Sequence, residues 1–584
     1  MIHLTINGKN VEVEEGSTIL EAARKANIDI PTLCFLKGIN EVGDCRMCVV
    51  EVEGRRGLAT ACIQKAEEGM VVNTSTPTVI EARRVVLDLI LSNHDRECLT
   101  CTRNGNCELQ KLAQQFYVDD IRYKGERNVH EIDDQSPSIV RDFNKCVLCR
   151  RCVATCKKVQ GIGAIDSANR GFASAVSTYA NKSLNDVNCT FCGQCIQACP
   201  VGALKEKDST KEVWAALRDP EKYVVVQTAP AVRVALGEEF GMEIGTNVTG
   251  KMVTALKTLG FDKVFDTNTA ADLTIMEEGT EFLDRFQNGG TLPMITSCSP
   301  GWVRYLELNY PDLIPNLSTC KSPHQMFGAI IKSYFAEKNN IDPAKIYVVS
   351  VMPCVAKKYE CSRDELGQEN ILDVDLSITT RELSKMIKEA GIDLLSLEDE
   401  SFDHPLGESS GAADIFGATG GVLEAALRTA YEWATNKELK DVNFTSVRGF
   451  EGIKETSIDV DGTIVNVCVA STLGNARKVM DEVVAGKSKY HIIEIMACPG
   501  GCIAGGGQPY HHGNYDIVKK RAQALYNIDA NKELRKSHTN KSIIKLYNEF
   551  LDKPCSSTAH KYLHTHYFDK SSTYKKEKIL STNG

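Results

Sequence analysis

The sequence lacks the features that mark several large classes of protein. No run approaches the ~18 consecutive apolar residues of a membrane helix, and the first residues contain no apolar segment typical of a secretory signal. The net charge is -9, so no basic excess points to a nucleic-acid partner. Hydrophobic residues make up 42% and charged residues 25%, which excludes disorder and coiled coil as whole-chain descriptions. We therefore expect a soluble, cytoplasmic protein of several domains that does not bind membranes or nucleic acid.

Cysteine, in contrast, is abundant, with 23 residues. In a long chain without a secretion signal, reducing conditions keep thiols from pairing, so dense cysteine indicates metal ligation rather than disulfide bonds. Fifteen of the cysteines precede residue 200, and all fifteen lie in clusters with short spacing. This distribution predicts several metal centres in the N-terminal third of the chain.

The first cluster follows a predicted β-hairpin. Residues 2–6 and 10–14 alternate in polarity around Asn7-Gly8, a strong hairpin signal, and a short helix is expected over 17–26, capped by its first residue. A hairpin and one helix are typical of a β-grasp module. Four thiolates suit a 2Fe–2S centre, with a zinc site or scattered core cysteines as the alternative. The ligands would be Cys34, Cys45, Cys48 and Cys62.

The second cluster has one histidine and three cysteines, spaced H-x3-C-x2-C-x5-C after a helix expected over 78–93. Three thiolates are one ligand short of a 4Fe–4S centre, and a neutral imidazole can replace the fourth and alter the reduction potential. Zinc is the alternative metal, since Cys3His is a standard zinc set. The ligands would be His94, Cys98, Cys101 and Cys107.

The third and fourth clusters repeat the spacing C-x2-C-x2-C-x3-C within 137–208. This run is typical of bacterial two-cluster ferredoxins, in which the fourth cysteine of each copy ligates the cluster of the other copy. Two 4Fe–4S clusters are therefore predicted, and clusters in series form a path for single electrons. One cluster would be held by Cys146, Cys149, Cys152 and Cys199, and the other by Cys156, Cys189, Cys192 and Cys195.

Beyond residue 220 the pattern changes to alternating strands and helices, as in an α/β domain. Buried strands are expected at 224–226, 347–351 and 492–495. Three further cysteine segments each follow an apolar run, so loops at strand ends would converge on one site. The segments are TSCSPGW (296–302), MPCVAKKYE (352–360) and EIMACPGGCIAGGG (494–507). Three cysteines in other settings are interpreted as buried or incidental thiols, namely Cys361, Cys468 and Cys555.

These three segments resemble the signature motifs of [FeFe] hydrogenases, and the order of the N-terminal clusters resembles the clostridial multi-cluster type. The resemblance extends to about residue 570. It implies an anaerobic oxidoreductase that catalyses 2H⁺ + 2e⁻ ⇌ H₂. It also implies an active centre, the H-cluster, in which a 4Fe–4S cubane shares one thiolate with a diiron unit carrying CO, cyanide and an azadithiolate bridge.

The resemblance assigns roles to individual residues. Cys354 and Cys498 match ligands of the cubane, and Cys502 matches the ligand that also bridges to the diiron unit. Lys357 matches the lysine that hydrogen-bonds a cyanide, where a charge-assisted bond in a dry pocket is strong. The other matched residues pack against the diiron unit or offer it backbone contacts, namely Ala229, Pro230, Met352, Phe416 and Met496.

The first motif departs from the family pattern. The family has two adjacent cysteines, a proton relay followed by the fourth cubane ligand, whereas this chain has Cys298 and Ser299. A serine hydroxyl is a poor iron ligand unless it is deprotonated. Three alternatives follow: Ser299 ligates as an alkoxide, Cys298 moves into the ligand role, or the substitution weakens retention of the cofactor.

The family's proton path matches four more residues. From the Cys298 relay to the surface they are Glu278, Ser318, Glu281 and Arg285. Burial allows a carboxyl group to exchange protons near neutral pH. The alternative interpretation of the acidic run 277–281 is a solvated helix face.

Electrons would be exchanged with ferredoxin or with a flavin- and NAD-binding partner subunit. No Gly-rich dinucleotide fingerprint is present, so any nucleotide site would lie on the partner. Two alternatives come from other classes. One is a non-catalytic electron-transfer subunit, like the cluster-bearing subunit of respiratory NADH dehydrogenases, and the other is an H₂ sensor or a cluster-assembly protein.

The predicted fold is multidomain and combines α+β with α/β parts. One 2Fe–2S cluster, three accessory 4Fe–4S clusters and the H-cluster are expected. The predicted domains are a β-grasp 2Fe–2S domain (1–78), a His/Cys 4Fe–4S domain (79–125), a two-cluster ferredoxin-like domain (126–209), a large two-lobed α/β catalytic domain (210–555) and a polar surface tail (556–584).

Overall fold

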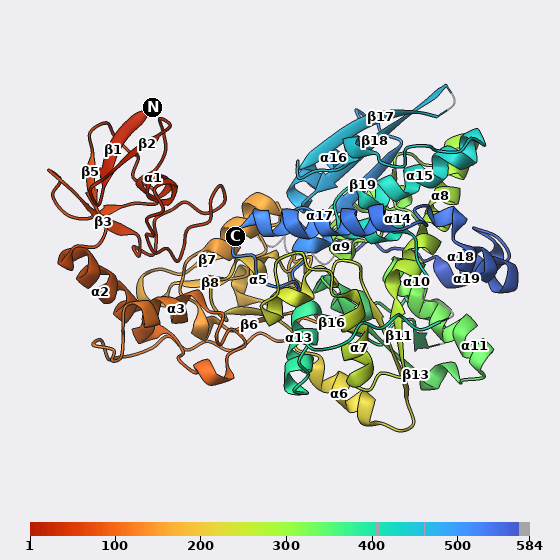
Figure 1. Ribbon diagram of the computed structural model, residues 1–584, viewed down its shortest axis with the longest axis horizontal. Helices are drawn as coiled ribbons and strands as arrows, with labels where there is room; N and C mark the ends of the chain where they lie inside the picture. The colour runs from red at the N-terminus through yellow and green to blue at the C-terminus, as the bar shows by residue number, and fades with distance from the viewer. Residues whose placement is uncertain (369, 405–407, 461, 572–584) are drawn as a thin grey trace. The chain divides into compact units, whose positions relative to one another are not determined.

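The computed structural model divides into two compact units (Figure 1). Among the described residues, no helix combines the length and the apolar character that crossing a lipid bilayer requires. The described residues are 1–368, 370–404, 408–460 and 462–571. Unit 1 comprises 1–159, 163–184 and 195–205, and unit 2 comprises 160–162, 185–194 and the described residues from 206 onward.

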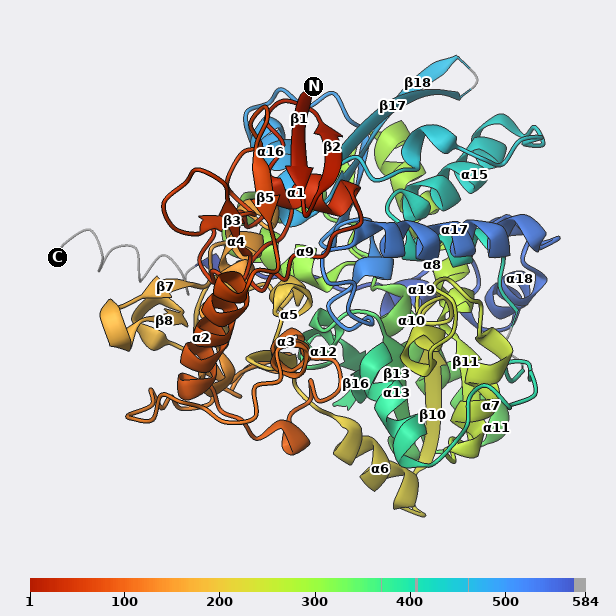
Figure 2. The same ribbon diagram turned by 60° about the vertical axis from the view of Figure 1, so that its left-hand side comes forward.

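Unit 1 begins with a five-stranded sheet of order β2-β1-β5-β3-β4, on which helix α1 packs (Figure 2). The predicted hairpin is confirmed, because β1 and β2 pair antiparallel across Asn7 and Gly8. The helix begins later than expected: Thr18, not Ser17, is its N-cap, and it forms a capping box with Glu21. The bounds are β1 (Ile2–Ile6), β2 (Lys9–Val13), α1 (Ile19–Lys25), β3 (Val49–Val52), β4 (Ala59–Thr60) and β5 (Val71–Asn73).

The rest of unit 1 is built from short elements between the cysteine clusters. Its long helix, α2, begins with Thr76 as N-cap and Pro77 as first residue, a favoured start for a helix. The other main elements are small because metal ligation, not a large apolar core, is expected to hold such segments together. The bounds are α2 (Pro77–Asn93), α3 (Glu108–Gln115), β6 (Ile139–Arg141), α4 (Arg151–Ala154), β7 (Asp166–Ala168) and β8 (Ala175–Ser177).

The first sheet of unit 2 is parallel, with strand order β11-β10-β13-β16. Successive residues of β10 enter opposite cores, Val224 and Val226 in one and Val225 in the other, so both faces of the sheet are covered. The strands expected at 224–226 and 347–351 are confirmed. The bounds are β10 (Tyr223–Thr228), β11 (Lys263–Asp266), β13 (Ile346–Met352) and β16 (Leu376–Thr379).

The second sheet of unit 2 has the order β12-β19-β18-β17. Its first three strands are parallel, and β17 and β18 form the long hairpin that extends at the upper right of Figure 1. The strand expected at 492–495 is confirmed as β19. The bounds are β12 (Met294–Ile295), β17 (Ile453–Val460), β18 (Thr463–Ser471) and β19 (Ile492–Met496).

Helices connect and cover these two sheets. Helix α8 is long and mostly buried, because Asp266 caps its N-terminus and its first three turns are enclosed by other helices. The helices that matter for the site are α8 (Thr267–Asn288), α9 (Pro300–Asn309), α10 (Pro323–Ile330), α12 (Ala356–Cys361), α14 (Gly411–Asp414), α15 (Gly421–Thr435) and α17 (Tyr515–Asn531).

The surface tail expected from Ser556 is wrong for residues 556–571. Ser556 caps helix α19 (Ser557–Leu563), and Leu563 is fully buried against the core that contains α10. The chain then hydrogen-bonds from Thr565 to the backbone of Thr319. The polar composition misled the prediction, because the apolar residues of this segment are few but lie on one helix face. The remainder of the predicted tail, 572–584, is outside the described residues.

Candidate active site

One cavity of about 90 Å³ collects the late cysteine motifs. Parallel strands present their carboxyl ends at the same edge of a sheet, and the loops that leave β10, β12, β13 and β19 all reach this cavity. The residues expected at the H-cluster line it together, namely Ala229, Pro230, Cys298, Ser299, Met352, Cys354, Lys357, Phe416, Met496, Cys498 and Cys502. Their gathering is a finding of the structure, while their roles as ligands remain predictions.

Two glycines allow the third motif to approach its neighbours closely: Gly505 faces the second motif, and Gly501 faces the segment after Phe416. A Cβ on Gly505 would lie 2.2 Å from the carbonyl oxygen of Pro353, and a Cβ on Gly501 would lie 2.7 Å from the backbone nitrogen of Thr419. Only glycine permits such close approach of two backbones. The close approach places Cys502 and Cys354 on the walls of the same cavity.

The thiols of the cavity suit a metal cluster. Burial raises the pKa of Cys354 and Cys498, and it raises the pKa of Cys502 to about 12. Thiols buried in this way stay protonated unless a cation compensates the thiolate charge, which is what iron would do. Cys192, a predicted ligand of a ferredoxin-like cluster, lines the same cavity.

Lys357 is held at the edge of the cavity by a buried network. Its Nζ donates to Oε2 of Glu360 at 2.8 Å and to Oγ of Ser322 at 2.9 Å, and it lies 3.4 Å from the carbonyl oxygen of Cys298. Nδ1 of His324 lies 2.7 Å from the same carboxylate oxygen. Although burial raises the pKa of Glu360, Lys357 and His324 lower it to about 2. Glu360 therefore stays charged and orients the ammonium group.

Hydrogen bonds join three of the residues of the predicted proton path, namely Ser318, Glu281 and Arg285. Oγ of Ser318 donates to Oε2 of Glu281 at 2.9 Å, and Nη2 of Arg285 donates to Oε1 at 2.6 Å. Burial and the charge of Glu281 raise the pKa of Glu278 to about 8, and Ser318 opposes this shift. Burial raises the pKa of the Cys298 thiol, and the negative charge of Glu278 raises it further.

The alternative interpretation of the run 277–281 as a solvated helix face is wrong. Glu277 is fully buried and Glu278 is 3% exposed. Oε1 of Glu278 has no hydrogen-bond partner within the described part of the chain. Burying a carboxyl oxygen without a hydrogen-bond partner lowers the stability of the fold, and such groups are common at functional sites. Because Glu278 also interacts with Cys298, it is a candidate for proton exchange.

Sequence reasoning missed several residues that support the site. Glu360 stands three residues after Lys357 on α12, so helical spacing could have identified it as the partner. His324 and Ser322 carry no such signal, because only the tertiary structure brings the start of α10 beside α12.

Several of the predicted cysteine ligands in unit 1 interact with one another. Cys34 interacts with Cys45, and Cys48 with Cys62, and charge effects link the two pairs. The charge of Cys199 contributes to raising the pKa of three thiols of the preceding repeat. Cys199 therefore lies near these thiols, as the crossed ligand arrangement of a two-cluster ferredoxin would require. These thiols are Cys146, Cys149 and Cys152.

Two predicted ligand sets are less complete in the structure. Cys101 and Cys107 interact, and His94 is buried with an Nδ1 that has no hydrogen-bond partner among the described residues, as a ligand nitrogen requires. The other ferredoxin-like set is divided between the two units, with Cys156 and Cys195 in unit 1 and Cys189 and Cys192 in unit 2.

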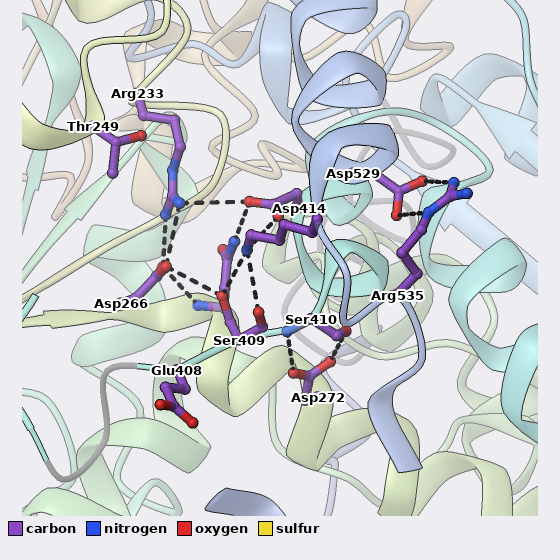
Figure 3. Close-up of polar contacts among 12 residues, drawn as sticks. Arg233, Thr249, Asp266, Asp272, Glu408, Ser409, Ser410, Asp414, Asp529 and Arg535 are labelled. Atoms are coloured by element: carbon purple, nitrogen blue, oxygen red, sulfur yellow. Dashed lines mark hydrogen bonds and ion pairs between the residues drawn. The ribbon is translucent and has the colours of Figure 1, made fainter. Parts of the chain in front are cut away.

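A buried ionic network links two segments that line the cavity (Figure 3). The guanidinium of Arg233, after β10, pairs with Asp266 at 2.6 Å and lies 3.5 Å from Asp414 of α14. Lys532, after α17, pairs with Asp414 at 2.6 Å. The network joins the loop carrying Ala229 to the turn carrying Phe416, both of which line the cavity.

Comparison with known protein families agrees with this arrangement. Five family models match successive parts of the chain. They describe a 2Fe-2S iron-sulfur cluster binding domain (1–77), the NADH-ubiquinone oxidoreductase-G iron-sulfur binding region (83–122), the ferredoxin-like domain of NADH-quinone oxidoreductase subunit 3 (136–205), the C-terminal domain of the iron only hydrogenase large subunit (222–506) and the iron hydrogenase small subunit (515–570).

Whole proteins and a solved structure extend the comparison. The NADP-reducing hydrogenase subunit HndD of Solidesulfovibrio fructosivorans is 54% identical, covering 98% of this chain and 99% of that protein. Iron hydrogenase 1 of Clostridium pasteurianum is 44% identical, covering 97% and 99%. A solved variant of [FeFe]-hydrogenase HydA1 from Chlamydomonas reinhardtii is 42% identical with a TM-score of 0.56, covering 62% of this chain and 99% of that one.

A non-catalytic electron-transfer subunit would explain the N-terminal matches but not the hydrogenase matches from residue 222 onward. The residues that line the cavity, except Cys192, and the carboxyl groups of the predicted proton path lie within that hydrogenase part. The chain therefore belongs to the iron-only hydrogenase family.

Proposed function

We propose that this chain is the catalytic subunit of a nucleotide-linked hydrogenase and exchanges electrons with a flavin- and NAD(P)-binding partner. The observation that carries the proposal is the cavity in which the late thiols, a buried lysine and a buried carboxyl chain meet. As an iron-only hydrogenase, the chain is an oxidoreductase that interconverts protons, electrons and H₂.

The H-cluster would be held by Cys354, Cys498 and Cys502, with Ser299 at the fourth position. When bound, it supplies the open iron site and the basic amine at which H₂ is formed or split. The apolar wall provided by Met352, Met496 and Phe416 excludes water from this group. Lys357 would offer its ammonium group to an anionic ligand, because Glu360 and Ser322 hold it at the cavity.

Cys298 would serve as the proton relay. A relay thiol is not available as an iron ligand, so Ser299 would be the residue that faces the cubane. Cys298 packs with the cluster that contains Ala271 and Ile275 of α8, the helix that carries Glu278. The carboxyl of Glu278 then exchanges a proton with Cys298 on one side and with Ser318 on the other. Glu281 passes the proton on toward Arg285, which is partly exposed.

Four accessory clusters would carry electrons to the cavity, one 2Fe–2S and three 4Fe–4S. Cys192 supports this route, because it lines the cavity and its charge acts on Cys498. The partner is inferred from the relative named as an NADP-reducing hydrogenase subunit, together with the lack of a dinucleotide fingerprint in this chain. Ferredoxin is the alternative electron partner.

Anaerobic infrared spectroscopy tests the cofactor assignment. Protein matured with the diiron cofactor should show bands in the CO and cyanide stretching region and should evolve H₂ from reduced viologen. The same protein, co-purified with its partner under native conditions, should reduce NAD(P)⁺ with H₂. Absence of the bands in fully matured protein would refute the H-cluster assignment. Activity with ferredoxin, together with purification without a nucleotide-binding subunit, would refute the proposed partner.

A further inference from the structure

Helix α19 presents a group of metal-binding side chains that the proposed H-cluster and accessory clusters do not use. One donor atom each from Cys555, His560 and His564 lie within 4.8 Å of one another. Cys555 was interpreted as an incidental thiol, but it stands immediately before the helix, beside both histidines. His560 is exposed, so solvent ions can reach the group.

The local spacing favours metal binding. The three residues follow the pattern C-x4-H-x3-H, and the histidines are four residues apart, with His560 within α19 and His564 as its C-cap. Their rings lie 4.0 Å apart between centroids. Histidines at this helical spacing with one cysteine are donors that zinc accepts.

We propose that Cys555, His560 and His564 form a Zn²⁺ site. Tetrahedral zinc, with Zn–N of ~2.0 Å and Zn–S of ~2.3 Å, holds its ligand atoms roughly 3.3–3.6 Å apart. Closing the site therefore requires a contraction of about 1 Å, which the exposed side chain of His560 can supply. A water molecule would complete the coordination.

The surroundings of His564 resemble the outer partners that orient a metal ligand. Its Nε2 lies 2.9 Å from Oε2 of Glu277, and its Nδ1 lies 2.8 Å from Oγ1 of Thr319. If zinc binds one nitrogen, the other keeps its hydrogen bond, which fixes the ring and the tautomer. Glu277 is itself held by Tyr547 and by the backbone nitrogen of Cys555.

A second group of donors shares His564 but is less suitable. It contains Glu281 and Cys320. Glu281 already accepts hydrogen bonds from Arg285 and Ser318, so zinc there would have to displace a buried ion pair. In the group around Cys555, zinc would replace one of the two hydrogen bonds of the His564 ring and would leave the ion pair of Arg285 with Glu281 intact.

The site also lies close to the proposed proton route, and this consequence rests on the proposed function. Thr319, which contacts His564, lies 3.2 Å from Oε1 of Glu281 through its Oγ1. A divalent cation on His564 repels a proton that moves along Glu281, and the repulsion is only weakly screened in a buried setting. Bound zinc should therefore slow H₂ evolution.

Zinc binding is measured on the full, cluster-loaded chain by anaerobic equilibrium dialysis with metal analysis. Cys555→Ser and His560→Gln remove donors, and His560 is exposed, so the second variant tests the site without disturbing the core. Cys468→Ala is the matched control, because it removes a buried thiol from β18. We expect one zinc equivalent in the wild type and the control, and an affinity at least about tenfold lower in both donor variants.

Zinc K-edge absorption identifies the ligands independently of activity. One sulfur and two imidazole nitrogens are expected in the wild type. Equal zinc binding by all four proteins, or a first shell without sulfur, overturns the site. If zinc binds as expected but slows viologen-driven H₂ evolution equally in wild type and Cys555→Ser, the link to the proton route is overturned. Protein without hydrogenase activity refutes the proposed function and leaves the binding result intact.

Discussion

Glu278 shows how the surroundings of a residue create its chemistry. An exposed glutamate is charged at neutral pH, but burial and the nearby Glu281 raise the pKa of Glu278 to about 8. The carboxyl group is therefore mostly protonated at neutral pH and can give or take a proton there. Ser318 and Cys298 both interact with Glu278, and its place in a proton route stays a prediction.

The first prediction concerns pH. H₂ evolution should fall as the pH rises through about 8, because Glu278 then loses the proton that it would pass inward. Glu278→Gln, which cannot exchange a proton, should lower kcat by about 10²–10⁴-fold and abolish this limb of the profile. The measurement is viologen-driven H₂ evolution between pH 6 and 9.

Asp284→Asn is the matched control, since it removes a charge from the exposed side of the same helix. Its activity and pH profile should equal those of the wild type. A Glu278→Gln enzyme that retains full activity would show that protons reach the cavity by another route.

The second prediction concerns Ser299. If this residue faces the cubane, Ser299→Cys supplies the fourth thiolate and should slow the loss of iron to a chelator, whereas Ser299→Ala should accelerate it. Iron release is followed by absorbance, and the cubane by electron paramagnetic resonance. Identical release from all three proteins would mean that Ser299 is not a ligand, and would favour Cys298 in that role.

At the scale of elements, the site depends on segments that are distant in sequence but share one ionic network. Arg233 follows β10, Asp266 caps α8, Asp414 ends α14 and Lys532 follows α17. All but Lys532 are almost fully buried. Such charges are tolerated because each has opposite charges beside it, and removing one leaves the others uncompensated. The network thus holds the turn with Phe416 against the loop with Ala229.

The third prediction follows from this network. Asp414→Ala leaves two cations without their shared carboxylate and should lower the free energy of unfolding by about 3–5 kcal/mol. Chemical denaturation of the cluster-loaded protein measures the loss. The exposed pair of Lys257 and Glu400 provides the comparison, and Glu400→Ala should cost about 1 kcal/mol or less. Equal losses in the two variants would show that the buried network does not hold these elements.

At the scale of the whole molecule, the chain combines an electron path with a catalytic cavity. Of the clustered cysteines of the N-terminal third, Cys192 lines the cavity, and the late cysteines line it together with Cys298, where the proposed proton route begins. Electrons would therefore enter the cavity near Cys192, and protons would enter it near Cys298.

The fourth prediction tests this electron path at His94. If His94 ligates a 4Fe–4S cluster, His94→Cys replaces a neutral ligand with a charged thiolate and should lower the reduction potential of that cluster. Potentiometric titration followed by electron paramagnetic resonance measures the shift. His130→Gln is the control, because its backbone groups, not its ring, bond to Asn144. A redox-silent site that contains zinc would refute the cluster.

Features that depend on short spacing could be predicted from the amino-acid sequence alone. Cys146, Cys149 and Cys152 predict a cluster because ligands three residues apart can surround one metal centre. Runs such as 347–351 predict buried strands because they are mostly apolar. Lys357 and the three late motifs were recognised from the same kind of local pattern.

Contacts between groups that are distant in sequence became known from the packing of the folded chain. It placed His324 beside Glu360, Ser318 between two glutamates, and His564 against Glu277, each pair separated by tens to hundreds of residues. It also showed that the polar segment after Ser556 packs into the core. The physical reason is that burial and charge pairing depend on the packing of whole elements, and no local pattern encodes which helix will cover a given side chain.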